Sequence, residues 1–152
     1  MCQRVYVASA FELPAIRRSA KSPYLDVHPV TGTSPVRASL RQDLPFLYLA
    51  GAHLECGCGF PDEPSGPDGK RTKLDPADVK SLAALGDFLR PACGKYATVQ
   101  LYLCWAGQES DPPEGHRRVS LDELRQPAFR LKHKQLLTVG RTLHGRRRRT
   151  RG

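Results

Sequence analysis

Residues 96–105 read YATVQLYLCW, and apolar side chains alternate with more polar ones along this stretch. Successive side chains of a β-strand point to opposite faces of a sheet, so this alternation predicts a strand with one face in a core. The core face would carry Ala97, Val99, Leu101, Leu103 and Trp105. The opposite face is more polar, and a second layer of chain would have to cover it if it is buried.

A second strand and a helix precede this stretch. Residues 46–52, FLYLAGA, form a continuous apolar run, which indicates a strand buried on both faces. Asp75 and Pro76 are typical of a helix start, and the apolar positions that follow keep helical spacing until Pro91. We therefore expect a helix over residues 76–90. Strand, helix and strand in this order favour a right-handed parallel crossover.

The remaining segments add smaller elements. Residues 4–9, RVYVAS, are typical of a strand, and Ser120 with Glu123 predicts a capping box that opens a short helix. Alternating apolar residues predict a last strand over residues 130–139. Four prolines make the chain between residues 14 and 35 loop-rich, and residues 36–41 fit either a short strand or a turn.

These elements predict one α+β domain over residues 1–140. We expect a mixed sheet that contains residues 46–52, 97–105 and 130–139, is covered by the helix 76–90, and gains further strands at its edges. A chain of this size can bury a sufficient core without disulfide or metal staples.

The formal charge of +9 is concentrated at one end of the chain. Residues 141–152 hold six arginines and no acid, so the other 18 basic and 15 acidic residues give the domain a charge of only +3. We expect this arginine-rich tail to be disordered. An arginine run can bind nucleic acid through its phosphates without sequence preference, and a solvated extension without a partner is the alternative. The candidate contacts are Arg146, Arg147, Arg148, Arg149 and Arg151.

Several classes of protein are disfavoured. The chain carries neither a signal core nor the roughly 20 consecutive apolar residues of a membrane helix, so we expect a cytoplasmic protein with no membrane partner and with reduced thiols. P-loop, dinucleotide-binding, HExxH and GxSxG motifs are missing, which disfavours the common cofactor enzymes but leaves open whether the protein is an enzyme. The acids after the cysteine motif, including Asp62, have the chemistry of oxygen ligands or a general base, but we interpret them as solvated loop residues because of their proline and glycine neighbours.

The most specific local feature is the motif His53-x-x-Cys56-Gly57-Cys58-Gly59, at the end of the strand 46–52. Ligands tend to bind beyond the carboxyl ends of strands in sheets with parallel strands. Thiolate and imidazole are soft ligands that suit zinc, and a closed structural zinc site needs four of them. The first hypothesis is therefore a zinc site formed by His53, Cys56 and Cys58 and completed by Cys104 or Cys2.

Two other readings of the motif stay open. Cys56 and Cys58 could form a redox or nucleophilic thiol pair, because a neighbouring histidine raises the thiolate fraction of a cysteine. A disulfide within C-x-C closes a small strained ring and is easily reduced. Alternatively, the cysteines are small buried hydrophobes, the glycines shape a turn and the protein is an interaction module.

Three segments carry a resemblance to a known family. They are Met1-Cys2-x-Arg4-x-Tyr6-Val7-Ala8-Ser9, Gly51-Ala52-His53-x-x-Cys56-Gly57-Cys58-Gly59-Phe60 and Leu101-Tyr102-x-Cys104-Trp105-Ala106-Gly107. The chain resembles a family of small uncharacterised bacterial proteins over most of residues 1–139. The resemblance implies no activity, but it implies that Cys2, His53, Cys56, Cys58 and Cys104 belong to one recurring pattern.

Overall fold

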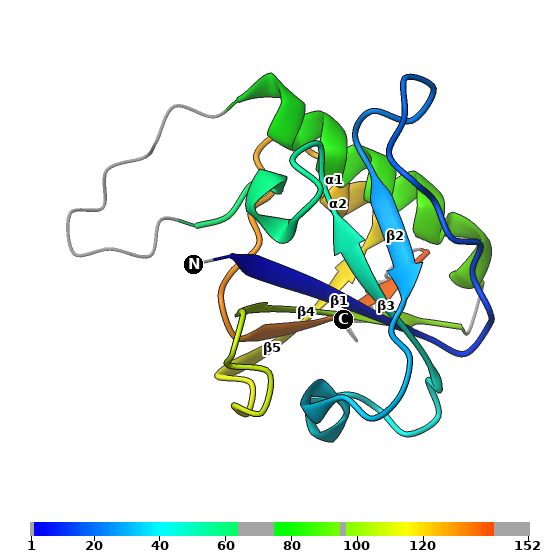
Figure 1. Cartoon of the computed structure of the whole chain (residues 1–152), viewed down its shortest axis with the longest axis vertical. Coiled ribbons are helices and arrows are strands. Elements are labelled where there is room, and N and C mark those ends of the chain that lie inside the picture. Colours follow the sequence, from blue (N-terminus) through cyan, green and yellow to red (C-terminus); the bar gives the residue numbers. More distant parts are fainter. Residues whose placement is uncertain (1, 64–74, 95–96, 142–152) are drawn as a thin grey trace, which may run out of the picture.

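Six strands form one mixed sheet in the residues that the computed structural model describes, which are 2–63, 75–94 and 97–141 (Figure 1). Their order across the sheet is β2-β3-β1-β4-β6-β5. Neighbouring strands are antiparallel except for β5 and β6, which are parallel. The strands are β1 (Gln3–Ser9), β2 (Asp26–Pro29), β3 (Phe46–Gly51), β4 (Val99–Trp105), β5 (Gly115–Ser120) and β6 (Gln135–Gly140).

Helices and short 3-10 turns connect the strands. The helices are α1 (Pro76–Leu89) and α2 (Leu121–Leu124), and the 3-10 turns are η1 (Pro35–Ser39), η2 (Gly57–Gly59) and η3 (Arg90–Ala92). This arrangement confirms a single α+β domain with one main helix. None of the helices in the described part of the chain is long and apolar enough to cross a membrane.

The first strand of the chain lies in the interior of the sheet. β1 pairs with β3 on one side and with β4 on the other, and it is antiparallel to both. β3 and β4 therefore run in the same direction, as a crossover through α1 requires, but they are not neighbours. The expectation that the other strands are added only at the edges was wrong, because β1 takes the place between them.

Each face of the sheet buries its own core. One core packs α1 and α2 against the sheet (Figure 1), and it includes Leu82, Leu85, Leu101 and Leu103. Burial of Leu101 and Leu103 confirms the register predicted for residues 97–105. The second core lies on the opposite face, where Tyr102 and Cys104 are covered by residues of the segment 36–47. A second layer therefore explains the more polar face of β4.

Both helix starts follow the sequence signals. The Asp75 side chain accepts a hydrogen bond from the N–H of Ala77, and Pro76 occupies the first position of α1. The N–H of Glu123 donates to the Ser120 hydroxyl, and the Glu123 carboxylate accepts from the Ser120 N–H, which completes the predicted capping box of α2. These bonds pair backbone N–H groups that have no partner within the helix.

The sequence analysis did not predict the two edge strands, and it placed the start of the last strand too early. β2 and β5 lie at the two edges of the sheet and carry few apolar residues, so they lack an alternating pattern. Residues 36–41 contain the 3-10 turn η1 rather than a strand. The predicted last strand, 130–139, was too long at its start. Lys134 has a φ of 56°, which breaks an extended chain, and β6 begins at the next residue.

Candidate functional site

The cysteine motif lies at one end of the central strands, where β1 begins with Gln3 and where β3 and β4 end. We call this border of the sheet the Gln3 edge, and it is distinct from the edge strands β2 and β5. Gln3 of β1 pairs with Trp105 at the end of β4, and the turn η2 packs against β1, β3 and α1. Gly57 allows this close approach. A Cβ atom at position 57 would lie 2.8 Å from the backbone oxygen of Gln3, so a larger residue could not occupy it without moving the backbone.

Three of the five cysteines gather at this edge. Cys2 and Cys58 are exposed, Cys56 is half-buried, and all of them carry free thiols. Burial raises the pKa of the Cys56 thiol, the backbone N–H of Cys58 opposes that rise, and the nearby thiols of Cys58 and Cys2 add to it. The Cys2 thiol is thus close enough to affect the pKa of Cys56, but among the described residues no group of three ligand atoms within 4.8 Å of one another contains a cysteine.

Gln3 connects the thiols to a second group of polar side chains. Its backbone N–H donates to Cys58 Sγ over 3.2 Å. Its side-chain Nε2 donates to Asp62 Oδ2 over 2.7 Å and lies 3.0 Å from His133 Nε2. Because the Asp62 carboxylate can only accept, the amide nitrogen of Gln3 must face it. Nε2 of a neutral His133 then accepts the second N–H.

His133 is held in an apolar environment. Its ring stacks on Trp105 with centroids 4.4 Å apart and planes 17° from parallel. Burial lowers the pKa of His133, and the Asp62 carboxylate opposes that shift. His133 Nδ1 and Gln3 Oε1 are buried and have no hydrogen-bond partner among the described residues. Gln3 is only 7 % exposed and the His133 side chain 13 %, whereas the Asp62 side chain is 33 % exposed, so the cluster reaches solvent at Asp62.

His53 faces α1 rather than the thiols. The buried hydroxyl of Ser81 lies 3.2 Å from His53 Nδ1 and accepts the His53 backbone N–H over 3.1 Å. Asp78 Oδ1 lies 3.5 Å from Nε2 of the same ring. The ligand atoms of His53, Asp75 and Asp78 lie within 4.8 Å of one another. Among the described residues, no other three histidine, cysteine, aspartate or glutamate side chains lie this close together.

The carboxylate of Asp78 is crowded by other acids. Burial raises the pKa of Asp78, and Asp75 and Asp62 raise it further, while His53 and Arg130 lower it. The carboxylates of Asp75 and Asp62 therefore repel the carboxylate of Asp78. A cation between them would reduce this repulsion.

Cys104 lies on the other face of the sheet. Its thiol is fully buried in the second core, beside Tyr6 and Tyr102, and burial raises its pKa to about 11. Alternate residues of β4 point to opposite faces, so Cys104 is separated by the sheet from the core that α1 covers. Of the two proposed fourth ligands, the fold brings Cys2 to the motif and leaves Cys104 on the opposite face.

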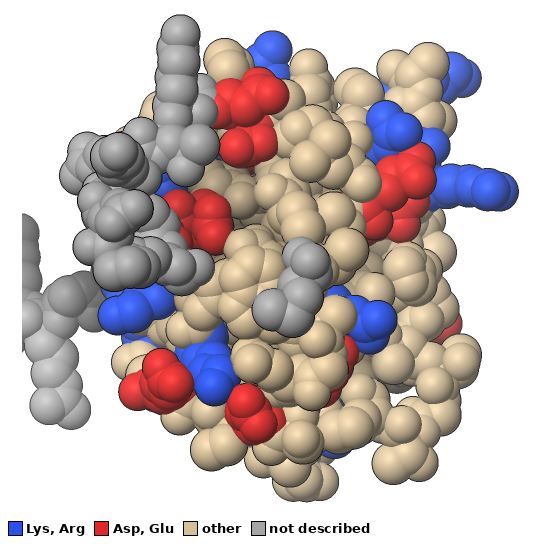
Figure 2. Space-filling model, turned by 60° about the vertical axis from the view of Figure 1, so that its left-hand side comes forward, with Lys and Arg blue, Asp and Glu red and all other residues tan. Residues whose placement is uncertain are grey.

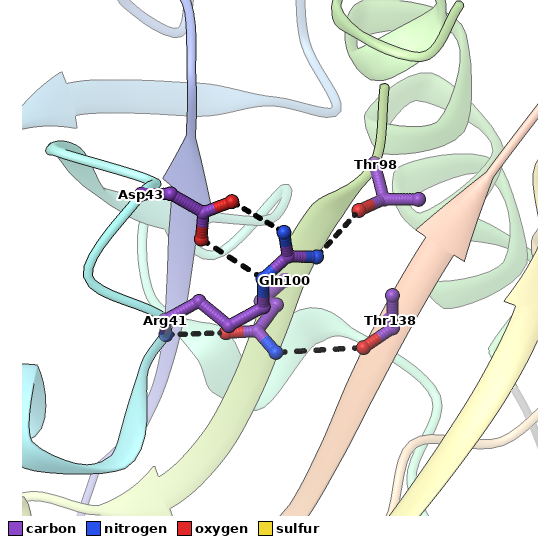
Figure 3. Close-up of polar contacts among 5 residues, drawn as sticks. All are labelled: Arg41, Asp43, Thr98, Gln100 and Thr138. Carbon is purple, nitrogen blue, oxygen red and sulfur yellow. Dashed lines mark hydrogen bonds and ion pairs between the residues drawn. The ribbon is translucent and has the colours of Figure 1, made fainter. Parts of the chain in front are cut away.

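The same face as Cys104 carries a paired polar network (Figure 3). The Gln100 side chain accepts the backbone N–H of Arg41 over 2.8 Å and donates to Thr138 Oγ1 over 3.4 Å. The Arg41 guanidinium reaches Thr98 and forms an ion pair with Asp43. Both ends of the buried Gln100 amide have partners, which is the pattern of a structural network.

A separate hollow lies between the segment 12–15 and the strands β2 and β3. It has a volume of about 270 Å³ and is lined by polar and apolar groups of residues that include Glu12, Leu13, Val30 and Phe46. None of the cysteines lines it. The hollow and the thiol-bearing edge are therefore different features of the molecule.

The charge of the domain shows no single dominant sign on the face in Figure 2, where acidic and basic side chains are interspersed. The candidate nucleic-acid contacts Arg146, Arg147, Arg148, Arg149 and Arg151 lie outside the described residues. The tail and its predicted nucleic-acid affinity stay predictions.

Sequence reasoning missed the residues that surround the thiols. Asp62 was interpreted as a solvated loop acid, but it accepts a hydrogen bond from the buried Gln3 amide. His133 was assigned to the alternation of the last strand, and Gln3 to no role. The weak signal available was a long polar side chain just before the strand RVYVAS. Its partners lie 59 and 130 residues away, which local patterns do not reveal.

Comparisons with known proteins found no match to a family model, a curated protein or a solved structure.

Proposed function

We propose that the protein carries out thiol–disulfide exchange through Cys56 and Cys58. The observation that carries the proposal is the unequal placement of two neighbouring thiols. Cys58 is exposed and its sulfur accepts the N–H of Gln3, while Cys56 is half-buried and its pKa is raised by burial. An exposed sulfur with an N–H donor suits attack on a substrate, because the donor stabilises negative charge on sulfur. The half-buried Cys56 suits the second step, in which it attacks the mixed disulfide formed at Cys58.

The exchange balances in two steps. The Cys58 thiolate attacks a substrate disulfide, an S–S bond forms between Cys58 and one substrate sulfur, and the other substrate sulfur leaves as a thiolate. Cys56 then loses its proton to solvent and attacks Cys58 Sγ. The Cys56–Cys58 disulfide forms and the second substrate thiolate leaves. Two electrons pass from the protein dithiol to the substrate disulfide, and the same steps run in reverse when the oxidised protein meets a dithiol.

The small ring closed by a Cys56–Cys58 disulfide determines in which direction we expect the exchange to run. A disulfide that closes C-x-C is strained, so we expect it to be reduced more easily than an unstrained one. In the reducing cytoplasm, the location we expect, the protein would therefore stay a dithiol, and its oxidised form would readily oxidise or rearrange substrate thiols.

The test is to equilibrate the full chain in glutathione buffers and to map its disulfides by mass spectrometry. We expect one reversible disulfide between Cys56 and Cys58. Cys56→Ser should accumulate a mixed disulfide at Cys58, because the resolving thiol is lost, whereas Cys93→Ser should behave as the parent because Cys93 is buried elsewhere. Failure to form a Cys56–Cys58 disulfide in any buffer would reject the proposal.

A second candidate is binding of a divalent metal such as zinc. The specific observation in its favour is the group His53, Asp75 and Asp78, whose ligand atoms lie within 4.8 Å of one another. One imidazole and two carboxylates match an open zinc site with three protein ligands. Asp75 also caps α1, and the positive end of that helix disfavours a cation, so this function ranks second.

Elemental analysis with matched variants separates the two metal hypotheses. Zinc that is lost in Asp78→Asn and kept in Cys56→Ser/Cys58→Ser would support the histidine–aspartate site. The opposite result would support the cysteine site expected from the sequence. Protein without stoichiometric zinc, also after incubation with zinc, would reject both.

A further inference from the structure

Gln3 makes two hydrogen bonds to one short segment of chain, and this carries an inference about how Cys58 is held. Its backbone N–H donates to Cys58 Sγ over 3.2 Å, and its side chain donates to Asp62 over 2.7 Å. Cys58 and Asp62 belong to the same segment, residues 57–62, which also packs its Gly57 against the Gln3 backbone. The start of β1 thus holds this segment at three points.

The far side of Gln3 is also fixed. Its amide nitrogen lies 3.0 Å from His133 Nε2, and the His133 ring stacks on Trp105, the residue that pairs with Gln3 across β1 and β4. The N–H of Ala106 donates to the Cys2 carbonyl over 2.8 Å, which fixes the residue before Gln3. The donor that faces Cys58 therefore belongs to a rigid part of the sheet, while its acceptor lies in a turn.

We propose that Gln3 is the positioning residue for Cys58, and that its side chain, through Asp62 and His133, keeps the Cys58 sulfur aligned with the Gln3 backbone N–H. This inference rests on the proposed exchange function. Gln3 does not exchange electrons or protons with a substrate. It keeps a hydrogen-bond donor on the sulfur where negative charge forms when Cys58 becomes a nucleophile or a leaving group.

The expected effect follows from the loss of that alignment. Gln3→Ala keeps the backbone N–H but removes both side-chain contacts, so residues 57–62 can move away from β1. We expect the alkylation rate of Cys58 to fall about three- to tenfold, which is the range that the net contribution of one ordinary hydrogen bond gives. The midpoint potential of the Cys56–Cys58 pair should fall by about 15–30 mV, since a tenfold change in its equilibrium constant is about 30 mV.

A conservative replacement distinguishes positioning from a general loss of structure. Asp62→Ala should reproduce the effect of Gln3→Ala, because it removes the acceptor of the shorter bond. Asp62→Asn keeps a hydrogen-bonding oxygen at the same place and should retain most of the Cys58 rate. The double variant Gln3→Ala/Asp62→Ala should be no worse than either single one, because both break the same contact.

The experiment uses the full chain, iodoacetamide and residue-resolved mass spectrometry, with Gln126→Ala as a control for replacing an exposed glutamine. The proposal is supported if Cys58 is alkylated more slowly in Gln3→Ala and in Asp62→Ala, and at close to the parent rate in Asp62→Asn. Equal Cys58 rates in the parent, Gln3→Ala and Asp62→Ala overturn it. Alkylation of Cys58 does not require a disulfide. If no Cys56–Cys58 disulfide forms, the exchange function is rejected, but the alkylation rates still show whether Gln3 positions Cys58.

Discussion

Each face of the sheet carries a buried glutamine, and the two differ in how far their hydrogen bonds are satisfied. Gln100 has a partner at each end of its amide, in Arg41 and Thr138. Gln3 uses its amide nitrogen twice, while its oxygen has no partner in the described part of the chain. Fully paired buried groups stabilise a fold, whereas an unpaired one costs free energy. The difference agrees with a structural role for Gln100 and with the positioning role that we propose for Gln3.

The largest expected contrast between the two regions is in thiol reactivity. In the native protein, iodoacetamide should modify Cys58 on the order of a hundredfold faster than Cys104, because Cys104 reacts only after local opening of the core. Burial also raises the pKa of Cys104 to about 11, which leaves little thiolate at neutral pH. Mass spectrometry of partly alkylated protein measures both rates. In denaturant the rates should converge, and comparable rates in the native protein would contradict the burial of Cys104.

A smaller contrast is expected in stability. Gln100→Leu should lower the free energy of unfolding by about 2 kcal/mol, because it leaves the Arg41 N–H without its partner and removes one of the two contacts of the Thr138 hydroxyl, which keeps His116. Gln3→Leu should cost about 1 kcal/mol, because it removes an oxygen that has no partner among the described residues and because the partly exposed Asp62 carboxylate exchanges the lost contact for water, which leaves only His133 Nε2 unpaired. Urea denaturation of both variants checks this. A Gln3→Leu loss as large as that of Gln100→Leu would mean that Gln3 is mainly structural.

The smallest effect concerns pH and belongs to the Gln3 edge alone. Burial lowers the pKa of folded His133 below the unfolded value of about 6.5, so the unfolded chain binds more protons as pH falls through that range. The contribution of neutral His133 is intact above the unfolded pKa and is lost as pH falls through the folded one. Denaturation between pH 7 and 5 should show a stability decrease that is reduced in His133→Gln. A decrease of the same size in that variant would assign the pH dependence to other groups.

The sequence predicts the elements whose pattern arises from burial. Alternation along β4, the apolar run of β3 and the cap and proline of α1 each reflect a local rule, and each element appears in the structure. β2 and β5 were missed because edge strands need few apolar residues. The position of β1 was missed because residues 4–9 would have the same pattern at the edge or in the interior.

The candidate site was predicted less completely, for a related reason. The spacing of His53, Cys56 and Cys58 indicates reactive residue types, but it does not specify where each side chain points. His53 turns to Ser81 of α1, and the face of Cys104 is fixed by its parity in β4. The contacts of Gln3 depend on strand order, which joins residue 3 to residues 62 and 133. Local sequence patterns contain the parity of Cys104, but not the strand order or the direction of the His53 side chain.

The interior position of β1 has a consequence for the order of folding during synthesis. β1 needs β3 on one side and β4 on the other, and β4 begins at residue 99, long after β1 has been made. Until then β1 and β3 can pair, but one long edge of β1 stays open to other chains. Pairing across such separations also gives a high contact order, which is typical of slow folders. The contacts that join Gln3 to Cys58, Asp62 and Trp105 therefore cannot all be complete until β4 has been made.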